Sequence, residues 1–332
     1  MMRAVLLTLA LLLATPALAQ DATAPLTTRG QATAEEQELE RALRGGMISG
    51  RVSIPDAQSA NLIQPEGQDW RNFHNRTLFT IGIVAVCGTV ALLGLFLGIR
   101  GRLRVDAGLS GRTLTRFNLL ERVNHWMVAS SFIVLMLSGL NLTFGRYLIL
   151  PLLGPEAFTA LSLWGKIAHN FLSFPFVLGL LVMLLLWAKD NIPNALDVAW
   201  LKAGGGFLKG RHPPAGRFNA GQKGIFWITV LGGAAVAASG YVLIFPFYLT
   251  DIAGQQLAHV IHGVLAMVMI ATILAHIYIG SIGMEGAIDA MSTGQVDYNW
   301  AREHHSLWVD QELAKARQII DSPPAGKIGG AD

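Results

Sequence analysis

Five long apolar stretches limit what this chain can become. They cover residues 77–99, 122–144, 162–188, 225–247 and 257–282, and each is long enough to cross a bilayer. Inside the hydrocarbon layer every backbone N–H and C=O needs an internal partner, so stretches of this length must be helices. Only 14% of the 332 residues are charged, against about a quarter in soluble domains. The sequence therefore predicts an all-α, multi-pass integral membrane protein.

Basic residues in the connecting segments predict the orientation of these helices. Segments 100–121 and 189–224 are rich in Lys and Arg, whereas the two alternate connections hold Arg146 alone. Positive charge marks the cytoplasmic side of a bacterial inner membrane. We therefore expect both basic segments, and the polar tail 284–332 with a helix over 307–320, to be cytoplasmic. A charge balance of only +3, held in short loops, argues against a nucleic-acid partner.

The N-terminal region is expected outside the cell membrane. Residues 1–19 have the pattern of a secretory signal peptide with cleavage after Ala19; a short membrane anchor is the alternative. Residues 20–76 form a polar periplasmic segment, with a short helix near 34–44. Residues 77–99 would then be an extra transmembrane helix ahead of a four-helix domain, 122–283.

Four histidines lie at matched depths in the last four stretches. His262 and His276 are fourteen residues apart on one helix, which places them on one face about 40° and roughly 21 Å apart. His169 enters the membrane on the side of His262, and His125 on the side of His276. Two imidazoles at one depth suit a low-spin haem iron. The pattern predicts two haem b groups: an outer one held by His169 and His262, and an inner one held by His125 and His276.

Other interpretations of the histidines stay open. Each could instead form a hydrogen bond between helices or belong to a proton path. His259 competes with His262, but it is about 100° off the face of His276. With a single cysteine the chain has no CxxC or CxxCH motif, which excludes a thiolate-held iron–sulfur cluster and a c-type haem. The remaining histidines are expected at the surface: His74, His212, His304 and His305.

Small and basic residues near the four histidines are candidates for contacts with a macrocycle. Small residues would let a flat ring approach the helices, and basic ones would pair with its propionates. The small candidates are Gly139, Gly165, Ser239, Gly240 and Gly263, and the basic ones are Arg116, Arg122 and Lys166.

Four motifs carry a resemblance to a known family. ERVNHW contains His125, GKIAHNF contains His169, IHGVLAMVMIATILAH ends at His276, and RFNAGQKGIFW covers 217–227. Together they resemble the membrane cytochrome b (gamma) subunit of respiratory formate dehydrogenases, over about residues 116–310. The resemblance implies a four-helix di-haem bundle. It also implies a quinone beside Asn219, Gly221 and His276. From the residues alone, an N-cap at Asn219 and a turn at Gly221 are equally possible.

The resemblance implies a function in anaerobic respiration. A periplasmic iron–sulfur (beta) subunit would pass electrons to the outer haem, and menaquinone or ubiquinone would be reduced near the inner one. Formate itself would be oxidised on a molybdenum or tungsten (alpha) subunit, so no catalytic residue for that step is expected here. The cytochrome b subunit of a nickel–iron hydrogenase, or of another quinone-linked oxidoreductase, is the alternative. A transporter or structural anchor is the rival class.

Overall fold

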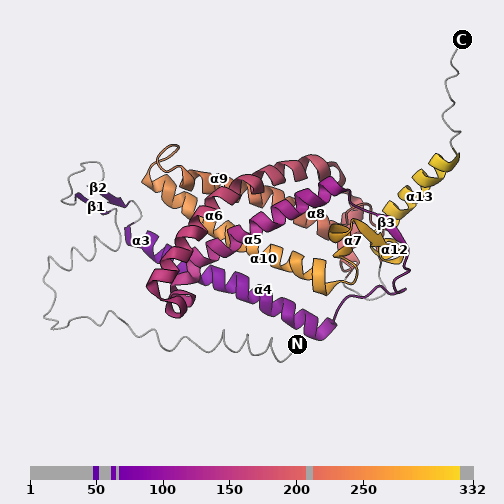
Figure 1. The fold of residues 1–332 in the computed structure, drawn as a ribbon, viewed down its shortest axis with the longest axis horizontal. Helices are drawn as coiled ribbons and strands as arrows, with labels where there is room; N and C mark the ends of the chain where they lie inside the picture. Colours follow the sequence, from indigo (N-terminus) through magenta and orange to yellow (C-terminus); the bar gives the residue numbers. More distant parts are fainter. Residues whose placement is uncertain (1–47, 52–60, 65–66, 207–211, 322–332) are drawn as a thin grey trace, which may run out of the picture.

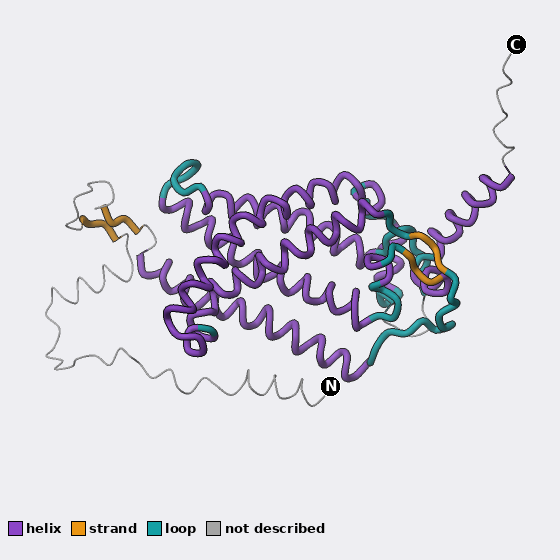
Figure 2. The backbone as a smooth tube through the Cα atoms, in the orientation of Figure 1, coloured by secondary structure: helices purple, strands orange, loops and turns teal. Residues whose placement is uncertain are grey.

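The computed structural model of this protein is predominantly helical (Figure 1) and describes residues 48–51, 61–64, 67–206 and 212–321. In this part of the chain five helices are long and apolar enough to cross a membrane, which confirms the predicted fold class. Figure 2 shows them side by side in an elongated bundle, with short strands and loops at its ends. The predicted signal peptide and the helix expected near 34–44 lie outside the described residues.

The five spanning helices follow the predicted apolar stretches. Two are uninterrupted α-helices: α4 (Leu78–Arg100) and α5 (Leu119–Leu148). A third, α6 (Leu150–Trp187), is broken near its start by a kink at Gly154. The other two contain π-helical turns. They are α8 (Ala220–Trp227) joined through η3 (Ile228–Gly232) to α9 (Gly233–Ile244), and α10 (Ile252–Tyr278) continuing into η4 (Ile279–Gly283).

Local sequence sets the ends of the hairpin formed by α5 and α6. Asn118 begins α5 with a capping box: its side chain accepts from Glu121 N at 3.0 Å, and the Glu121 carboxylate accepts from Asn118 N at 2.9 Å. Helix α6 begins well before the apolar stretch expected from residue 162. A turn ending at Gly154, with φ of 76°, is followed by Pro155, a residue favoured in the first turn of a helix. The apolar stretch marked only the membrane part of a longer helix.

Two consecutive glycines bring α9 close to its neighbours. A Cβ atom on Gly232 would lie 2.7 Å from the Met269 sulfur of α10, and one on Gly233 would lie 2.7 Å from Leu180 Cδ1 of α6. A side chain at either position would have to displace Met269 or Leu180. The two glycines therefore let side chains of α10 and α6 pack directly against the backbone of this helix.

Helix α4 lies against α10 along one side of the bundle (Figure 1). Leu78 packs with Met267 and Ile270 in a small apolar cluster. Gly263, a sequence candidate for a macrocycle contact, faces this helix instead, since a Cβ there would lie 2.8 Å from Leu78 Cδ2. The extra N-terminal span thus packs directly onto the helix that carries His262 and His276.

One end of the bundle carries the residues that precede α4. Strands β1 (Ile48–Arg51) and β2 (Asn61–Gln64) pair antiparallel, and they are followed by α3 (Gly67–Asn72) and the π-helical turn η1 (Phe73–Thr77). No break separates α3, η1 and α4. The helix therefore extends beyond the expected start of the span at residue 77.

The opposite end carries a folded unit that we call the cap. It consists of the linker 101–118, residues 189–219 as far as they are described, and residues 284–321. Strand β3 (Thr113–Thr115) of the linker pairs antiparallel with β4 (Gln295–Asp297) of the tail. Its remaining elements are η2 (Lys189–Asn191), α7 (Ala195–Lys202), α11 (Asp289–Ser292), α12 (Tyr298–His304) and α13 (Ser306–Asp321). Helix α13 confirms the helix predicted over 307–320.

His305 lies at the centre of the cap, and its expected surface position is wrong. The residue is fully buried. Its Nε2 accepts from Arg116 at 3.0 Å and its Nδ1 donates to Gly216 O at 2.9 Å, so it joins the linker, the loop before α8 and the tail. Arg116 is itself enclosed by four aromatic rings at 5.1 to 6.0 Å, from Phe117, Phe218, Trp300 and Trp308. His304 is half-buried beside it.

Acid should destabilise the cap. Burial and the neighbouring Arg116 hold the pKa of His305 well below its usual value, and burial together with His212 lowers the pKa of His304 to about 4. In the unfolded chain both rings bind a proton below about pH 6.5. The unfolded state then binds more protons than the folded one, so stability falls as the pH drops from 7.5 to 5.5. Thermal unfolding in detergent at the two pH values measures this.

A pair of variants isolates the contribution of His305. His305→Ala should cost about 1–3 kcal/mol at pH 7.5, because Arg116 and Gly216 O lose a partner, and it should reduce the dependence on pH. His74 is exposed at the other end of the bundle. His74→Ala should therefore change neither the stability at pH 7.5 nor its dependence on pH. A pH dependence of full size in His305→Ala would contradict the assigned role.

Candidate functional site

Two pairs of histidine rings lie within the bundle at different heights along α10. His276 of α10 and His125 of α5 have ring centroids 6.2 Å apart, and His262 of α10 and His169 of α6 have centroids 6.1 Å apart. All four residues are half-buried. The structure thus brings together the histidines that the sequence places at the same predicted depth in the membrane.

The spacing within each pair fits two imidazoles on one metal ion. A metal–nitrogen bond is about 2.0 Å long, and the nitrogen lies about 1.1 Å from the centre of its ring. Two imidazoles on opposite sides of one ion would therefore have ring centroids about 6.2 Å apart. A haem iron, whose other four ligands come from the macrocycle, would be left without an open position by two such rings and would suit electron transfer rather than oxygen binding.

Hydrogen bonds orient the rings of the pair farther from the cap. His262 Nδ1 lies 2.9 Å from Val236 O, and a carbonyl oxygen only accepts, so this nitrogen carries the proton. His169 Nδ1 lies 2.8 Å from Ser138 Oγ, which donates to Val134 O at 2.6 Å and therefore accepts from the ring. Both Nε2 atoms keep their lone pair. Metal-binding histidines are commonly fixed in this manner.

The pair nearer the cap is less completely satisfied by the protein. His125 Nδ1 is buried without a hydrogen-bond partner among the described residues. Its ring packs edge-on against Trp126 at 5.3 Å between centroids, and the Trp126 indole N–H donates to Met291 O in the cap at 3.0 Å. A buried ring nitrogen without a hydrogen-bond partner is unusual in a folded protein. A metal ion bound to the His125 ring would give one of its two nitrogens a partner.

Ring spacing alone does not single out these four histidines. His259 and His74 have centroids 6.3 Å apart, and both pack against Trp70 at 5.7 Å, but both are exposed at the end opposite the cap. His212 and His304 have centroids 6.4 Å apart within the cap. Position inside the bundle and partial burial distinguish the four. His259, the sequence alternative to His262, faces Trp70 and His74 instead of His169.

A comparison with protein families identifies the architecture. A sequence model of the family described as Prokaryotic cytochrome b561 matches residues 116–294, more than half of the chain. This chain belongs to that family. It is therefore a multi-pass membrane cytochrome b, a kind of protein that carries haem b. The match covers α5 to α10 and the first part of the cap's tail, with all four histidines inside it.

Curated relatives name one physiological context. The chain is 28% identical over 210 residues to the formate dehydrogenase cytochrome b556(fdo) subunit of Escherichia coli, covering 62% of this chain and 96% of that protein. It is 29% identical over 216 residues to the nitrate-inducible cytochrome b556(Fdn) subunit of the same organism, covering 64% and 96%. A formate dehydrogenase cytochrome b556 subunit of Haemophilus influenzae is 29% identical over 225 residues, covering 65% and 91%. Nearly the whole of each relative aligns with this cytochrome.

Small residues lie against the His169 and His262 rings. A Cβ on Gly240 would lie 3.1 Å from His262 Cε1, and one on Gly139 would lie 3.7 Å from His169 Cε1. Gly165 is adjacent to Ser138, with 3.7 Å between Cβ positions. Ser239 lies there too, with its Oγ 3.4 Å from His262 Nδ1. Of the five small residues predicted to admit a flat ring, four therefore lie around this pair.

Two of the three basic candidates for propionate contacts are used elsewhere. Arg116 is buried in the cap with His305. Arg122 donates to the backbone oxygens of Met291 and Ser292, which fastens the start of α5 to α11. Lys166 is exposed on α6.

A buried charge network that sequence reasoning missed begins one helical turn before His125. Glu121 Oε1 accepts from Arg217 at 2.6 Å and from the Trp187 indole N–H at 2.7 Å, and Arg217 also donates to Asp190 at 2.9 Å. Glu121 is 4% exposed. The available signal was the spacing of Asn118 and Glu121, which predicts a capping box. Nothing local indicates Arg217 as the partner.

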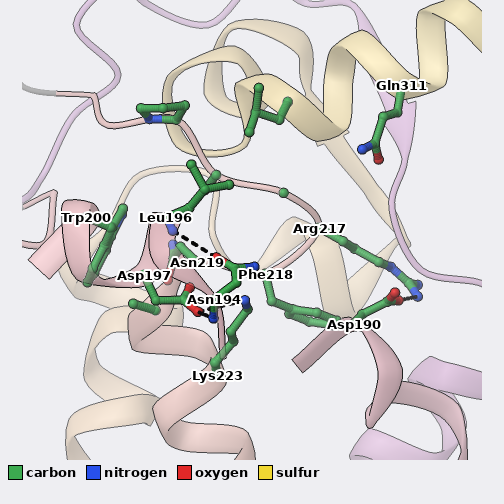
Figure 3. A pocket seen from close by; sticks show the side chains of 15 residues that line it. Asp190, Asn194, Leu196, Asp197, Trp200, Arg217, Phe218, Asn219, Lys223 and Gln311 are labelled. Carbon is green, nitrogen blue, oxygen red and sulfur yellow. Dashed lines mark hydrogen bonds and ion pairs between the residues drawn. The ribbon is translucent and has the colours of Figure 1, made fainter. Parts of the chain in front are cut away.

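The residues expected beside a quinone are only partly brought together. Asn219 caps α8, accepting from Gln222 N at 3.0 Å, which is the N-cap that the sequence left open. Gly221 lies in the first turn of α8, not in a separate turn, and a Cβ there would lie 3.1 Å from Trp200 Cη2. Asn219 and Trp200 line a cavity in the cap, shown in Figure 3; His276 is not among its lining residues.

Removing the Glu121 carboxylate should strongly destabilise the cytochrome. Glu121→Ala leaves the partly buried Arg217 with one of its two carboxylates, and breaking a buried pair costs about 3 kcal/mol. Asp310→Ala breaks an exposed pair with Arg302 and should cost at most about 1 kcal/mol. Denaturant titration of the two variants in detergent measures the difference. Equal losses would show that the Glu121 network contributes no more than a surface ion pair.

Proposed function

We propose that this cytochrome is the di-haem membrane subunit of a formate dehydrogenase complex. It would carry electrons from a periplasmic iron–sulfur subunit across the inner membrane to a quinone near the cytoplasmic side. The proposal depends mainly on one observation: two histidine pairs lie at different heights along α10. Within each pair the ring centroids are 6.1 or 6.2 Å apart. The similarity to formate dehydrogenase subunits over 96% of their length supports the choice of complex.

The proposed ligands are His169 with His262 for the outer haem b, and His125 with His276 for the inner one. Haem iron, when bound, supplies reversible one-electron chemistry. The protein holds the rings. Ser138 accepts from His169 Nδ1 at 2.8 Å, and Val236 O accepts from His262 Nδ1 at 2.9 Å, so each ring keeps the lone pair of Nε2 for the iron.

The proposed orientation places the cap in the cytoplasm. The two basic segments and the tail meet in the cap, where β3 pairs with β4 and Arg116 bonds to His305. Segments that lie on one side of the membrane can pack together in this way, and the positive-inside rule makes that side the cytoplasm. The pair His125/His276 would then be the inner one, and the segment with α3 would be periplasmic.

The proposed quinone site contains Asn219, Gly221 and His276. Its support is the family resemblance and the position of Asn219 at the cap end of the bundle. Asn219 also lines a small hollow with Met284, which follows directly on the η4 turn after His276. The proposed partners follow from the same function: an iron–sulfur beta subunit, and a molybdenum or tungsten alpha subunit on which formate would be oxidised.

The test of this function is purification of the intact complex from membranes. A complex with molybdenum or tungsten, two haem b per cytochrome and formate-to-quinone activity is expected. Nickel in the complex with hydrogen-dependent haem reduction would assign the cytochrome to a hydrogenase instead. Pure cytochrome without a haem b spectrum would overturn both assignments and favour a transporter or anchor.

Single histidine variants should separate the two haem sites. His169→Ala and His262→Ala should each remove about half of the haem b, and the same half, because two ring nitrogens hold each iron. Redox titration of the remaining haem identifies which midpoint potential is lost. His259→Ala, one helical turn from His262 and exposed, is the matched control and should keep both haems. Loss of different midpoints in His169→Ala and His262→Ala would disprove the pairing.

A further inference from the structure

A cavity of about 190 Å³ lies in the cap between α7, the start of α8 and the tail helix α13 (Figure 3). Charged side chains stand on two of its walls. Asp197 and Lys223 form one pair, and Arg217 and Asp190 form the other. Asn219, a proposed quinone contact, is also in its lining.

The size and lining of this cavity fit water better than a quinone ring. Sites for small organic ligands are usually about 300–1,000 Å³ and mostly apolar, whereas this one is smaller and carries four charged groups. A volume of this size holds several waters at about 30 Å³ each, and water needs two to four polar partners of the kind found here.

The Asp197 side chain lies in the cavity wall with little exposure. Its side chain is 14% exposed and that of Lys223 is 8% exposed, with 2.9 Å between Asp197 Oδ2 and Lys223 Nζ. The same oxygen accepts from Asn194 N at 2.7 Å, and Lys223 also donates to Ile192 O at 3.0 Å. Lys223 therefore positions a carboxylate that has access both to the cavity and to the surface of the cap.

We infer that this cavity is the water-filled proton inlet for quinone reduction, with Asp197 as its proton-transfer residue; the inference rests on the proposed function. Reduction of a quinone to a quinol takes two electrons and two protons, and each quinone oxygen gains an O–H bond. The electrons come from oxidation of formate to carbon dioxide on the partner subunit. The protons come from cytoplasmic water: Asp197 takes each one up and passes it to cavity water, and it ends each cycle unchanged.

A polar inlet would let protons reach a quinone bound at the end of the bundle. Charge is costly inside the hydrocarbon layer, so a proton cannot reach a membrane quinone through lipid-facing helices. The cap is where charged side chains reach the end of the bundle. Arg217 of the cavity wall forms an ion pair with Glu121, which lies one helical turn before His125, so a network of charged side chains extends from the cavity to the start of the helix that carries His125.

The experiment compares Asp197→Asn with Asp197→Glu in the intact complex. Asp197→Asn keeps a side-chain oxygen for Asn194 N but loses the titratable proton. Asp197→Glu keeps a carboxylate and the acidic residue typical of this helix position. Stopped-flow spectroscopy follows haem reduction by formate without quinone, and then haem reoxidation by a soluble short-chain quinone, in H₂O and in D₂O.

Asp197→Asn should slow haem reoxidation by roughly 10- to 100-fold, within the contribution of acid–base groups, and raise its solvent isotope effect. Haem reduction by formate and haem content should be unchanged. Asp197→Glu should restore most of the rate. Asp310→Asn, the same change at an exposed ion pair with Arg302, should behave as wild type.

The dependence of the rate on pH gives a second readout. The charged groups that face Asp197 are Lys223 of α8 and, across the cavity, Arg217 and Asp190, with Glu121 behind Arg217. A fall in reoxidation rate with rising pH that is much steeper in Asp197→Asn than in wild type supports the relay. A wild-type rate, or a slower rate with unchanged isotope effect and pH profile, would overturn it. If formate fails to reduce the haem of the wild-type complex, or quinone fails to reoxidise it, the proposed function has failed instead.

Discussion

The histidine-bearing face of α10 is the constraint on which the rest of the bundle depends. An imidazole in the membrane interior needs a partner for each polar atom, and α10 carries one at each of two heights. Helices α5 and α6 must therefore come close enough to present His125 and His169. The short contacts of Gly232 and Gly233 hold α9 against α10 and α6, and Val236 of α9 then fixes His262. Packing and ligand orientation are thus determined by the same helix contacts.

The cap differs from the bundle, because charged and polar side chains are buried in it beside its apolar core. Arg116 and Glu121 lie five residues apart, whereas Arg217 and His305 come from distant segments, and each of the four is held by hydrogen bonds or aromatic rings. Separating any one from its partners leaves an uncompensated group in a poorly hydrated place. This makes the cap specific in geometry. It also attaches the tail to the end of the bundle that carries His125 and His276.

The sequence was informative where one physical rule dominates, and less so where distant segments meet. Apolar length predicted all five spans, and periodicity along α10 singled out His262 and His276 together. The cap obeys no such local rule. Residues 284–321 are polar on average, and the burial of His305 depends on Arg116, almost two hundred residues earlier. Trp300 and Trp308 beside two histidines were the available signal, since a tail exposed to solvent has little use for two large aromatic residues.

The same reasoning explains why the candidate quinone residues were harder to interpret than the histidines. Asn219 accepts a backbone hydrogen bond at the N-terminus of α8 and also lines a polar cavity, so either role would explain an asparagine at this position. Fewer roles explain a transmembrane histidine, because an unpaired polar group in lipid is costly. Electron transfer benefits from a dry interior and proton uptake from a wet one. In α5 the change from polar to apolar surroundings takes a single helical turn, from Glu121, whose carboxylate accepts from Arg217 of the cap, to His125 in the bundle. A quinone bound beside His276, as proposed above, would meet both kinds of surroundings at this boundary.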